Sequence, residues 1–160
     1  REARLREVFA SFGEQVYLAA VDVANTTSVS EFVRALPSEW KPVDLLVANA
    51  GSDVGGRRPF VDGDANDWMS TINTNVNGVI QMCHAFLPSM QQRGCGHVVT
   101  IGSTAGLRAY VGGAAYVASK HAVKALTETL RLELKNTAVR ITEVAPASCN
   151  RRASTGSSLV

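Results

Sequence analysis

The stretch from Ala114 to Lys120, AAYVASK, contains two residues that could handle a proton together. Tyr116 and Lys120 are four positions apart, so a helix would place their side chains on one face, about one turn apart. A free tyrosine has a pKa of about 10, but a nearby lysine cation stabilises the phenolate and lowers that pKa. The spacing therefore fits a general acid–base pair, and a solvated pair on a helix surface is the alternative.

Three further positions could contribute to the same chemistry. Ser103 ends the apolar run GHVVTIGS, where a hydroxyl could hydrogen-bond a substrate carbonyl oxygen; a turn or cap residue is the alternative. Asn75 stands in NTNVNG inside a helical pattern, where asparagine is unfavourable, so it marks either a functional side chain or a break between two helices. Asn49 and Gly51 end LLVANAG, either in an ordinary turn or where the backbone approaches a ligand.

These residues stand on a regular alternation of helical patterns and short apolar runs. The patterns predict helices over residues 1–12, 26–36, 64–92 and 112–134, and strands over 16–23, 43–51, 96–103 and 139–146. Such an alternation predicts the α/β class, with a doubly wound parallel sheet and helices on both of its faces. Ligands of these sheets bind beyond the carboxyl ends of the strands, where we expect Asp22, Asn49, Gly51, Ser103 and Pro146.

The composition narrows the possible partners. The 160 residues suit one domain, and 16 basic against 14 acidic residues are too balanced to indicate binding to nucleic acid or to a membrane surface. No apolar run approaches the length of a membrane span, and the charged start does not resemble a signal peptide. We therefore expect a small-molecule partner and a cytoplasmic location.

The cysteines indicate neither a disulfide framework nor a metal site. The three cysteines Cys83, Cys95 and Cys149 are odd in number and lack C-x-x-C spacing. A zinc site would need Cys83, His84, Cys95 and His97, whose spacings fit no familiar zinc finger. We expect no metal and a reducing environment.

Taken in order, the motifs resemble the short-chain dehydrogenase/reductase family over roughly residues 1–146. The matching pieces are D-V (22–23), N-A-G (49–51), N-V-x-G (75–78), G-S-x-A-G (102–106), Y-x-x-x-K (116–120) and a late strand ending at Pro146. Each motif is weak alone, whereas their order and the Ser–Tyr and Tyr–Lys spacings are specific. The resemblance implies a Rossmann-like fold and an NAD(P)-dependent oxidoreductase that transfers hydride between the nicotinamide and a carbonyl or secondary alcohol.

The resemblance also implies a role for each catalytic position. Tyr116 would be the general acid or base, and Lys120 would lower the pKa of Tyr116 and bind the nicotinamide ribose. Ser103 would orient the carbonyl, and Asn75 would hold a water that links Lys120 to solvent. Asp22 and Val23 would contact the adenine, and the cofactor-binding set would also include Asn49, Ala50, Gly51, Tyr116, Lys120 and Pro146.

Within the family, the segments DWMSTINTNVNG and YVGGAAYVASK are similar to those of the NADP-dependent 3-hydroxy acid and serine dehydrogenases. Arg1 and Arg4 fall near the place where NADP-preferring members carry basic residues for the 2′-phosphate, although a charged helix face would look the same. We expect NADP, with NAD not excluded. Full-length members pair through long helices, so we expect a homodimer or homotetramer.

The sequence departs from the family pattern at both ends. The family opens with a β-α-β segment whose T-G-x-x-x-G-x-G turn holds the pyrophosphate, and the sequence contains no such turn. After Pro146 the usual glycine is Ala147. We therefore expect a partial NAD(P)-binding domain over 1–147, a tail over 148–160 that is disordered or not native to this fold, and a 160-residue chain that is not a stable active enzyme when made alone.

Two other functions compete with the oxidoreductase. The first is a catalytically inactive, truncated product that acts as a binding or regulatory protein. The second is a serine hydrolase that uses Ser103, which would need a G-x-S-x-G turn and a downstream histidine. The sequence has G-S-T-A-G instead, and His121 is the only histidine after Ser103.

Overall fold

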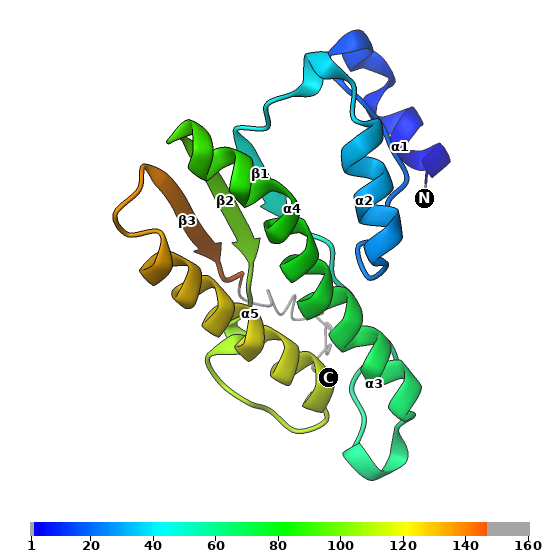
Figure 1. Cartoon of the computed structure of the whole chain (residues 1–160). Coiled ribbons are helices and arrows are strands. Elements are labelled where there is room, and N and C mark those ends of the chain that lie inside the picture. The colour runs from blue at the N-terminus through cyan, green and yellow to red at the C-terminus, as the bar shows by residue number, and fades with distance from the viewer. Residues whose placement is uncertain (1, 147–160) are drawn as a thin grey trace, which may run out of the picture.

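The computed structural model describes residues 2–146, which form an α/β unit with a parallel sheet (Figure 1). The strands are β1 (Leu45–Ala48), β2 (Gly96–Ile101) and β3 (Val139–Val144). The α-helices are α1 (Glu2–Phe9), α2 (Thr26–Ala35), α3 (Ala65–Ile72), α4 (Gly78–Arg93) and α5 (Ala114–Glu133). Shorter helical turns are η1 (Ala10–Gln15), η2 (Ser38–Trp40), η3 (Phe60–Asp62), η4 (Asn73–Asn77) and η5 (Thr104–Gly106). The tail predicted for 148–160 and the boundary at 147 lie outside the described residues.

The sheet has the order β1-β2-β3, and both neighbouring pairs are parallel. The register places Leu46 beside Val98 and Val98 beside Ile141, so one row of apolar side chains crosses all three strands. Parallel neighbours need long crossover connections, which α4 supplies between β1 and β2 and α5 supplies between β2 and β3. The α/β class and the parallel sheet are therefore confirmed.

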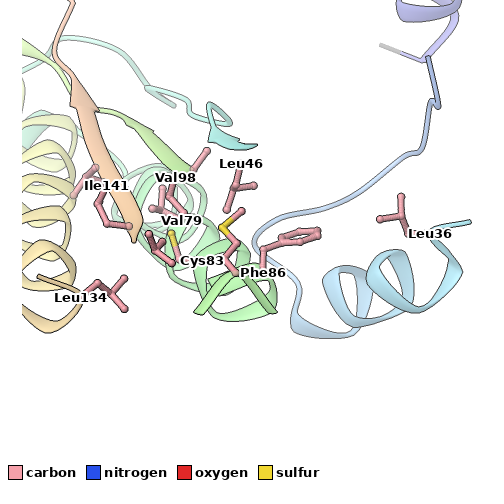
Figure 2. Packing of buried hydrophobic residues seen from close by; sticks show 12 residues of the cluster. Leu36, Leu46, Val79, Cys83, Phe86, Val98, Leu134 and Ile141 are labelled. Atoms are coloured by element: carbon pink, nitrogen blue, oxygen red, sulfur yellow. The ribbon is translucent and has the colours of Figure 1, made fainter. Parts of the chain in front are cut away.

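That apolar row packs against α4 and α5 to form the core (Figure 2). Met90 of α4, Val98 of β2 and Val123 of α5 have no exposed surface. A buried hydrogen bond adds a polar link, since the Thr100 and Thr127 hydroxyl oxygens are 2.9 Å apart. The core thus fixes α5, which carries Tyr116 and Lys120, against the strand that ends before Ser103.

Residues 16–23 do not form the strand that their apolar run predicts. A β-strand is defined by hydrogen bonds to a neighbouring strand, and within residues 2–146 only β1, β2 and β3 form such ladders. The side chains of Ala19 and Val21 instead line an apolar hollow of about 340 Å³ that Phe32 and Leu46 also line. None of residues 16–23 is buried, and Tyr17, Ala19 and Ala20 are exposed, so the apolar pattern here led to neither burial nor strand pairing.

The two helices that pack on the sheet, α4 and α5, lie on the same face of it (Figure 1). On the opposite face of β1, Leu45 and Val47 are about half exposed, at 54% and 49%. The sequence predicts helices on both faces, and within the described residues one face is covered. Leu45 and Val47 are nevertheless apolar, as expected for strands of a sheet covered on both faces.

Candidate active site

A cleft of about 350 Å³ opens beyond the carboxyl ends of β1 and β2, beside the first turns of α5. This is where ligands bind in parallel α/β sheets. Its lining contains six of the positions singled out from the sequence: Asn49, Gly51, Ser103, Tyr116, Lys120 and Pro146. Ile101, Gly102, Ser52 and Asp53 complete the wall. The fold therefore brings together side chains that are up to 97 positions apart, from Asn49 to Pro146.

Lys120 is held at the floor of this cleft. The residue is only 6% exposed, and its Nζ donates a hydrogen bond of 2.8 Å to the Ile101 carbonyl oxygen at the end of β2. Burial lowers the pKa of Lys120 from its ordinary value, and the negative charge of Glu143 acts in the opposite direction. The alternative of a solvated surface pair is therefore wrong for Lys120. An ammonium group has three N–H donors, so Lys120 can make two bonds beyond the one to Ile101.

Tyr116 and Ser103 face the same cleft from different elements. Tyr116 lies in the first turn of α5, and its ring centroid is 5.6 Å from the Lys120 Nζ. Ser103 follows β2 in an extended conformation, and its Oγ accepts a hydrogen bond of 3.1 Å from the Ala105 backbone N–H. Ser103 is therefore a cap residue of η5, which was one of the two alternatives for this position. It also lines the cleft, and its hydroxyl still has a proton to donate.

Asn75 lies behind the cleft wall in η4, which is a π-helical turn between α3 and α4. The Gly78 N–H bonds to the Asn73 carbonyl five residues earlier, so the helix continues through this turn with one extra residue, without a break. Asn75 is 1% exposed, and its amide pairs with the Ser52 backbone. The Ser52 N–H donates to Asn75 Oδ1 at 2.8 Å, and Asn75 Nδ2 donates to the Ser52 carbonyl at 2.9 Å.

The segment from Asn49 to Gly51 leaves β1 directly into the cleft. A Cβ placed on Gly51 would lie 3.3 Å from Asn75 Oδ1 and 3.9 Å from Lys120 Nζ. The glycine thus opens a space that the amide of Asn75 and the ammonium of Lys120 both border. Ala50 lies between two cleft residues without lining the cleft itself.

Asp22 and Val23 lie outside the cleft lining, in the turn that leads into α2. The Asp22 Oδ1 accepts a hydrogen bond of 3.0 Å from the Ala24 N–H, and the Ser28 hydroxyl accepts one of 2.9 Å from the Asp22 N–H. A Cβ on Gly78 would lie 2.7 Å from Val23 Cγ2, so this turn packs closely on the start of α4. Arg4 lies on the exposed side of α1, and Arg1 lies outside the described residues.

The family model for short chain dehydrogenase matches residues 1–157 of this chain. The chain belongs to the short-chain dehydrogenase family. Among curated relatives, it is 40% identical over 146 residues to the NADP-dependent 3-hydroxy acid dehydrogenase YdfG of Escherichia coli strain K12, covering 91% of this chain and 58% of the relative. It is 38% identical over 149 residues to sulfoacetaldehyde reductase 2 of Chromohalobacter salexigens, covering 91% and 59%.

Solved structures agree with this family assignment. The closed form of serine dehydrogenase complexed with NADP⁺ superposes with a TM-score of 0.88 at 40% identity, covering 92% of this chain and 59% of that structure. The resemblance to the 3-hydroxy acid and serine dehydrogenases is therefore confirmed. This short-chain dehydrogenase chain spans less than two thirds of the length of each of these relatives.

Three polar residues at the site escaped the sequence interpretation. Ser119 directly precedes Lys120 and is fully buried, and Ser52 directly follows N-A-G and pairs with Asn75. Glu143 lies on β3, where a Cβ on Gly102 would overlap its carboxylate. The sequence offered a signal for both serines, because Ser119 lies within Y-x-x-x-K and Ser52 directly follows N-A-G. Glu143 had none, because its proximity depends on the register of β2 against β3.

The remaining sequence hypotheses concern metal, hydrolysis and membranes. Within residues 2–146 no group of three or more His, Cys, Asp or Glu side chains could hold a metal ion. His121 is exposed and its Nδ1 lies 2.9 Å from the Val117 carbonyl oxygen, so the imidazole contacts its own helix rather than Ser103. None of the helices in the described part of the chain is long and apolar enough to cross a membrane.

Proposed function

We propose that this protein is an NADP-dependent oxidoreductase that interconverts a carbonyl and a secondary alcohol. The observation that carries the proposal is the convergence of Tyr116, Lys120 and Ser103 on one cleft. A phenol, a buried cation and a hydroxyl donor are the groups that carbonyl reduction requires, because the substrate oxygen must be oriented and then protonated. The bound cofactor would supply the hydride.

The residues of the chain would handle the proton and the geometry. In reduction, the Ser103 hydroxyl donates a hydrogen bond to the substrate carbonyl oxygen, and the Tyr116 hydroxyl gives its proton to the same oxygen. The Lys120 ammonium stabilises the negative charge left on Tyr116. In oxidation, Tyr116 takes the alcohol proton and Ser103 holds the oxygen in place. Asn75 Oδ1 and Lys120 Nζ border the space over Gly51, which suits a water that returns the proton to solvent.

The described residues fit the nicotinamide half of NADP. The two N–H donors of Lys120 beyond the bond to Ile101 match ribose hydroxyls, and the Ser52 hydroxyl is buried without a protein partner at the cleft wall. Asn49, Ala50, Gly51 and Pro146 remain proposed contacts. Asp22 and Val23, which lie outside the cleft lining, remain proposed contacts to the adenine. The sequence contains no T-G-x-x-x-G-x-G turn for the pyrophosphate.

The names of the relatives suggest which substrates to test first. The curated proteins are named for 3-hydroxy acids and for sulfoacetaldehyde, and the solved structure for serine, so we propose a small, acid-bearing alcohol or aldehyde. The same names favour NADP over NAD. Turnover of a panel of such compounds with NADPH and with NADH would test both choices.

The test of the acid–base role is Tyr116→Phe in the full-length protein. We expect hydride transfer to fall by roughly a hundredfold or more, the usual scale for losing a general acid. Tyr17→Phe is the matched control, because Tyr17 packs on Trp40 away from the cleft and should keep full activity. Full activity in Tyr116→Phe would exclude this role for Tyr116.

We also propose that the full-length protein pairs through α4 and α5. An apolar groove of about 300 Å³ runs between these helices, lined by Leu87, Leu126 and Leu130, with Ile80 45% exposed at its side. A second copy is the occupant that the family resemblance suggests. Ile80→Glu should lower the mass measured by light scattering toward that of a single chain, and an unchanged mass would contradict pairing through this groove.

The inactive alternative and the cytoplasmic location stay predictions. No contact within residues 2–146 favours an inactive binding product over an enzyme, and the named relatives are dehydrogenases and reductases. Absence of turnover by the full-length protein with every compound of the panel would favour the inactive product. Fluorescence microscopy of the tagged full-length chain would test the location.

A further inference from the structure

The buried Ser119, which precedes Lys120, makes hydrogen bonds to two elements of the site, α5 and η4. Ser119 has no exposed surface, and its Oγ donates a hydrogen bond of 2.7 Å to the Tyr116 carbonyl oxygen. The same Oγ accepts a hydrogen bond of 3.0 Å from Asn75 Nδ2. One hydroxyl therefore connects the turn of α5 that carries both Tyr116 and Lys120 to the π-helical turn η4.

The link to Ser119 and the bond to Ser52 together use both N–H groups of the Asn75 amide. One N–H of its Nδ2 goes to the Ser52 carbonyl and the other goes to Ser119, while its Oδ1 accepts from the Ser52 N–H. The chain of bonds thus runs from the segment after β1, through Asn75, to Ser119 and the backbone of Tyr116. The bond between Asn75 and Ser119 is buried and the bonds to Ser52 and Tyr116 are partly buried, so an unmade bond would cost more than at the surface.

We propose that Ser119 is a positioning residue for the acid–base pair, holding the turn between Tyr116 and Lys120 at a fixed distance from Asn75. The proposal rests on the function proposed above for Tyr116 and Lys120. The Tyr116 carbonyl is the group that an α-helix offers to the N–H of residue 120, so the Ser119 hydroxyl acts on the backbone that sets both side-chain positions. Displacements of about 1 Å at such a site can cost a factor of a hundred in rate.

The test compares full-length Ser119→Ala with full-length Thr127→Val. Thr127 is on the same helix, is equally buried and also makes a hydroxyl bond to another element, through Thr100. Its removal should therefore lower stability to a similar degree while leaving the site alone. Ser119→Ala should lower kcat roughly tenfold to a hundredfold, with KM within about twofold. Thr127→Val should leave both constants near those of the wild type.

The pH profile separates positioning from simple destabilisation. If the turn loosens, water reaches the Lys120 ammonium, and burial then lowers the pKa of Lys120 less than it does in the wild type. The alkaline limb of the pH–rate profile of Ser119→Ala should therefore move to higher pH. Ser119→Cys, which replaces the hydroxyl with a slightly larger thiol that bonds weakly, should give an intermediate displacement and guards against an alanine variant that fails to fold.

The outcomes can be told apart. A wild-type protein without carbonyl or alcohol turnover would remove the proposed function. An active wild type whose profile coincides with those of Ser119→Ala and Ser119→Cys would overturn the role of Ser119 alone. An equal displacement in Thr127→Val would also overturn it, because the effect would then follow general stability.

Discussion

Replacing Asn75 by alanine should weaken the fold far more than the same change two positions later. Asn75 is 1% exposed and its amide makes three hydrogen bonds, of 2.8, 2.9 and 3.0 Å. Asn77 belongs to the same π-helical turn, is exposed and makes a side-chain hydrogen bond to the exposed Asn73. The two asparagines therefore form a matched pair that differs in burial and bonding.

The expected cost follows from those bonds. A typical hydrogen bond contributes about 0.5–1.5 kcal/mol net, so losing three costs about 1.5–4.5 kcal/mol. Alanine favours the helix over asparagine by about 0.5 kcal/mol, which leaves a loss of about 1–4 kcal/mol for Asn75→Ala. Asn77→Ala should stay within about 0.5 kcal/mol of the wild type, as surface changes usually do.

Urea unfolding of the full-length protein at fixed pH would measure both changes. The free energy of unfolding should fall with urea concentration at the same slope in the two variants and the wild type. Differences between their unfolding midpoints then give the differences in stability. Equal losses for Asn75→Ala and Asn77→Ala would refute the reasoning, because they would show that the buried amide network contributes nothing specific. A stabilised Asn75→Ala would refute it more strongly.

Further predictions concern charge, close packing and thiol reactivity. Glu143→Gln should move the alkaline limb of the rate profile to lower pH, because the carboxylate raises the pKa of Lys120 against the lowering by burial, and without it Lys120 loses its proton earlier. Gly102→Ala should move the alkaline limb in the same direction as Glu143→Gln with little loss of stability in urea unfolding, because its Cβ would overlap the Glu143 carboxylate, the end of a flexible side chain that can turn away. Burial raises the pKa of the Cys83 thiol to about 11, so peptide mapping after iodoacetamide at pH 8 should find the exposed Cys95 labelled and Cys83 intact.

The elements that the sequence predicted well are those whose pattern depends on local burial. The helix expected over 112–134 is α5 at 114–133, and the strand expected over 139–146 is β3 at 139–144. Residues 16–23 show the limit of that reasoning. Their apolar side chains are partly covered, but strand formation requires a neighbour with a free ladder of backbone groups, which a local pattern does not encode.

The candidate site shows the same division. Tyr116, Lys120 and Ser103 could be named because each falls in a motif with fixed spacing. Ser119 bonds to Asn75, 44 positions away, and Glu143 lies close to Gly102, which directly follows the neighbouring strand β2, so these contacts follow from helix packing and strand register. For Asn75, the sequence signalled an unusual helix residue, whereas the extra residue in its turn appears only in the Gly78–Asn73 hydrogen bond.

The π-helical turn sets the rotational phase between two halves of one long helix. Before it, the fully buried Thr71 accepts a bond from the Val54 N–H beside the cleft; after it, Val79 and Cys83 enter the core. Each residue of an α-helix advances by about 100°, so deleting one residue between 73 and 77 would restore regular winding and turn one half by that angle relative to the other. Either the core contacts or the cleft wall would then face the wrong way. The length of this segment should therefore be more tightly constrained than the identity of its exposed residues.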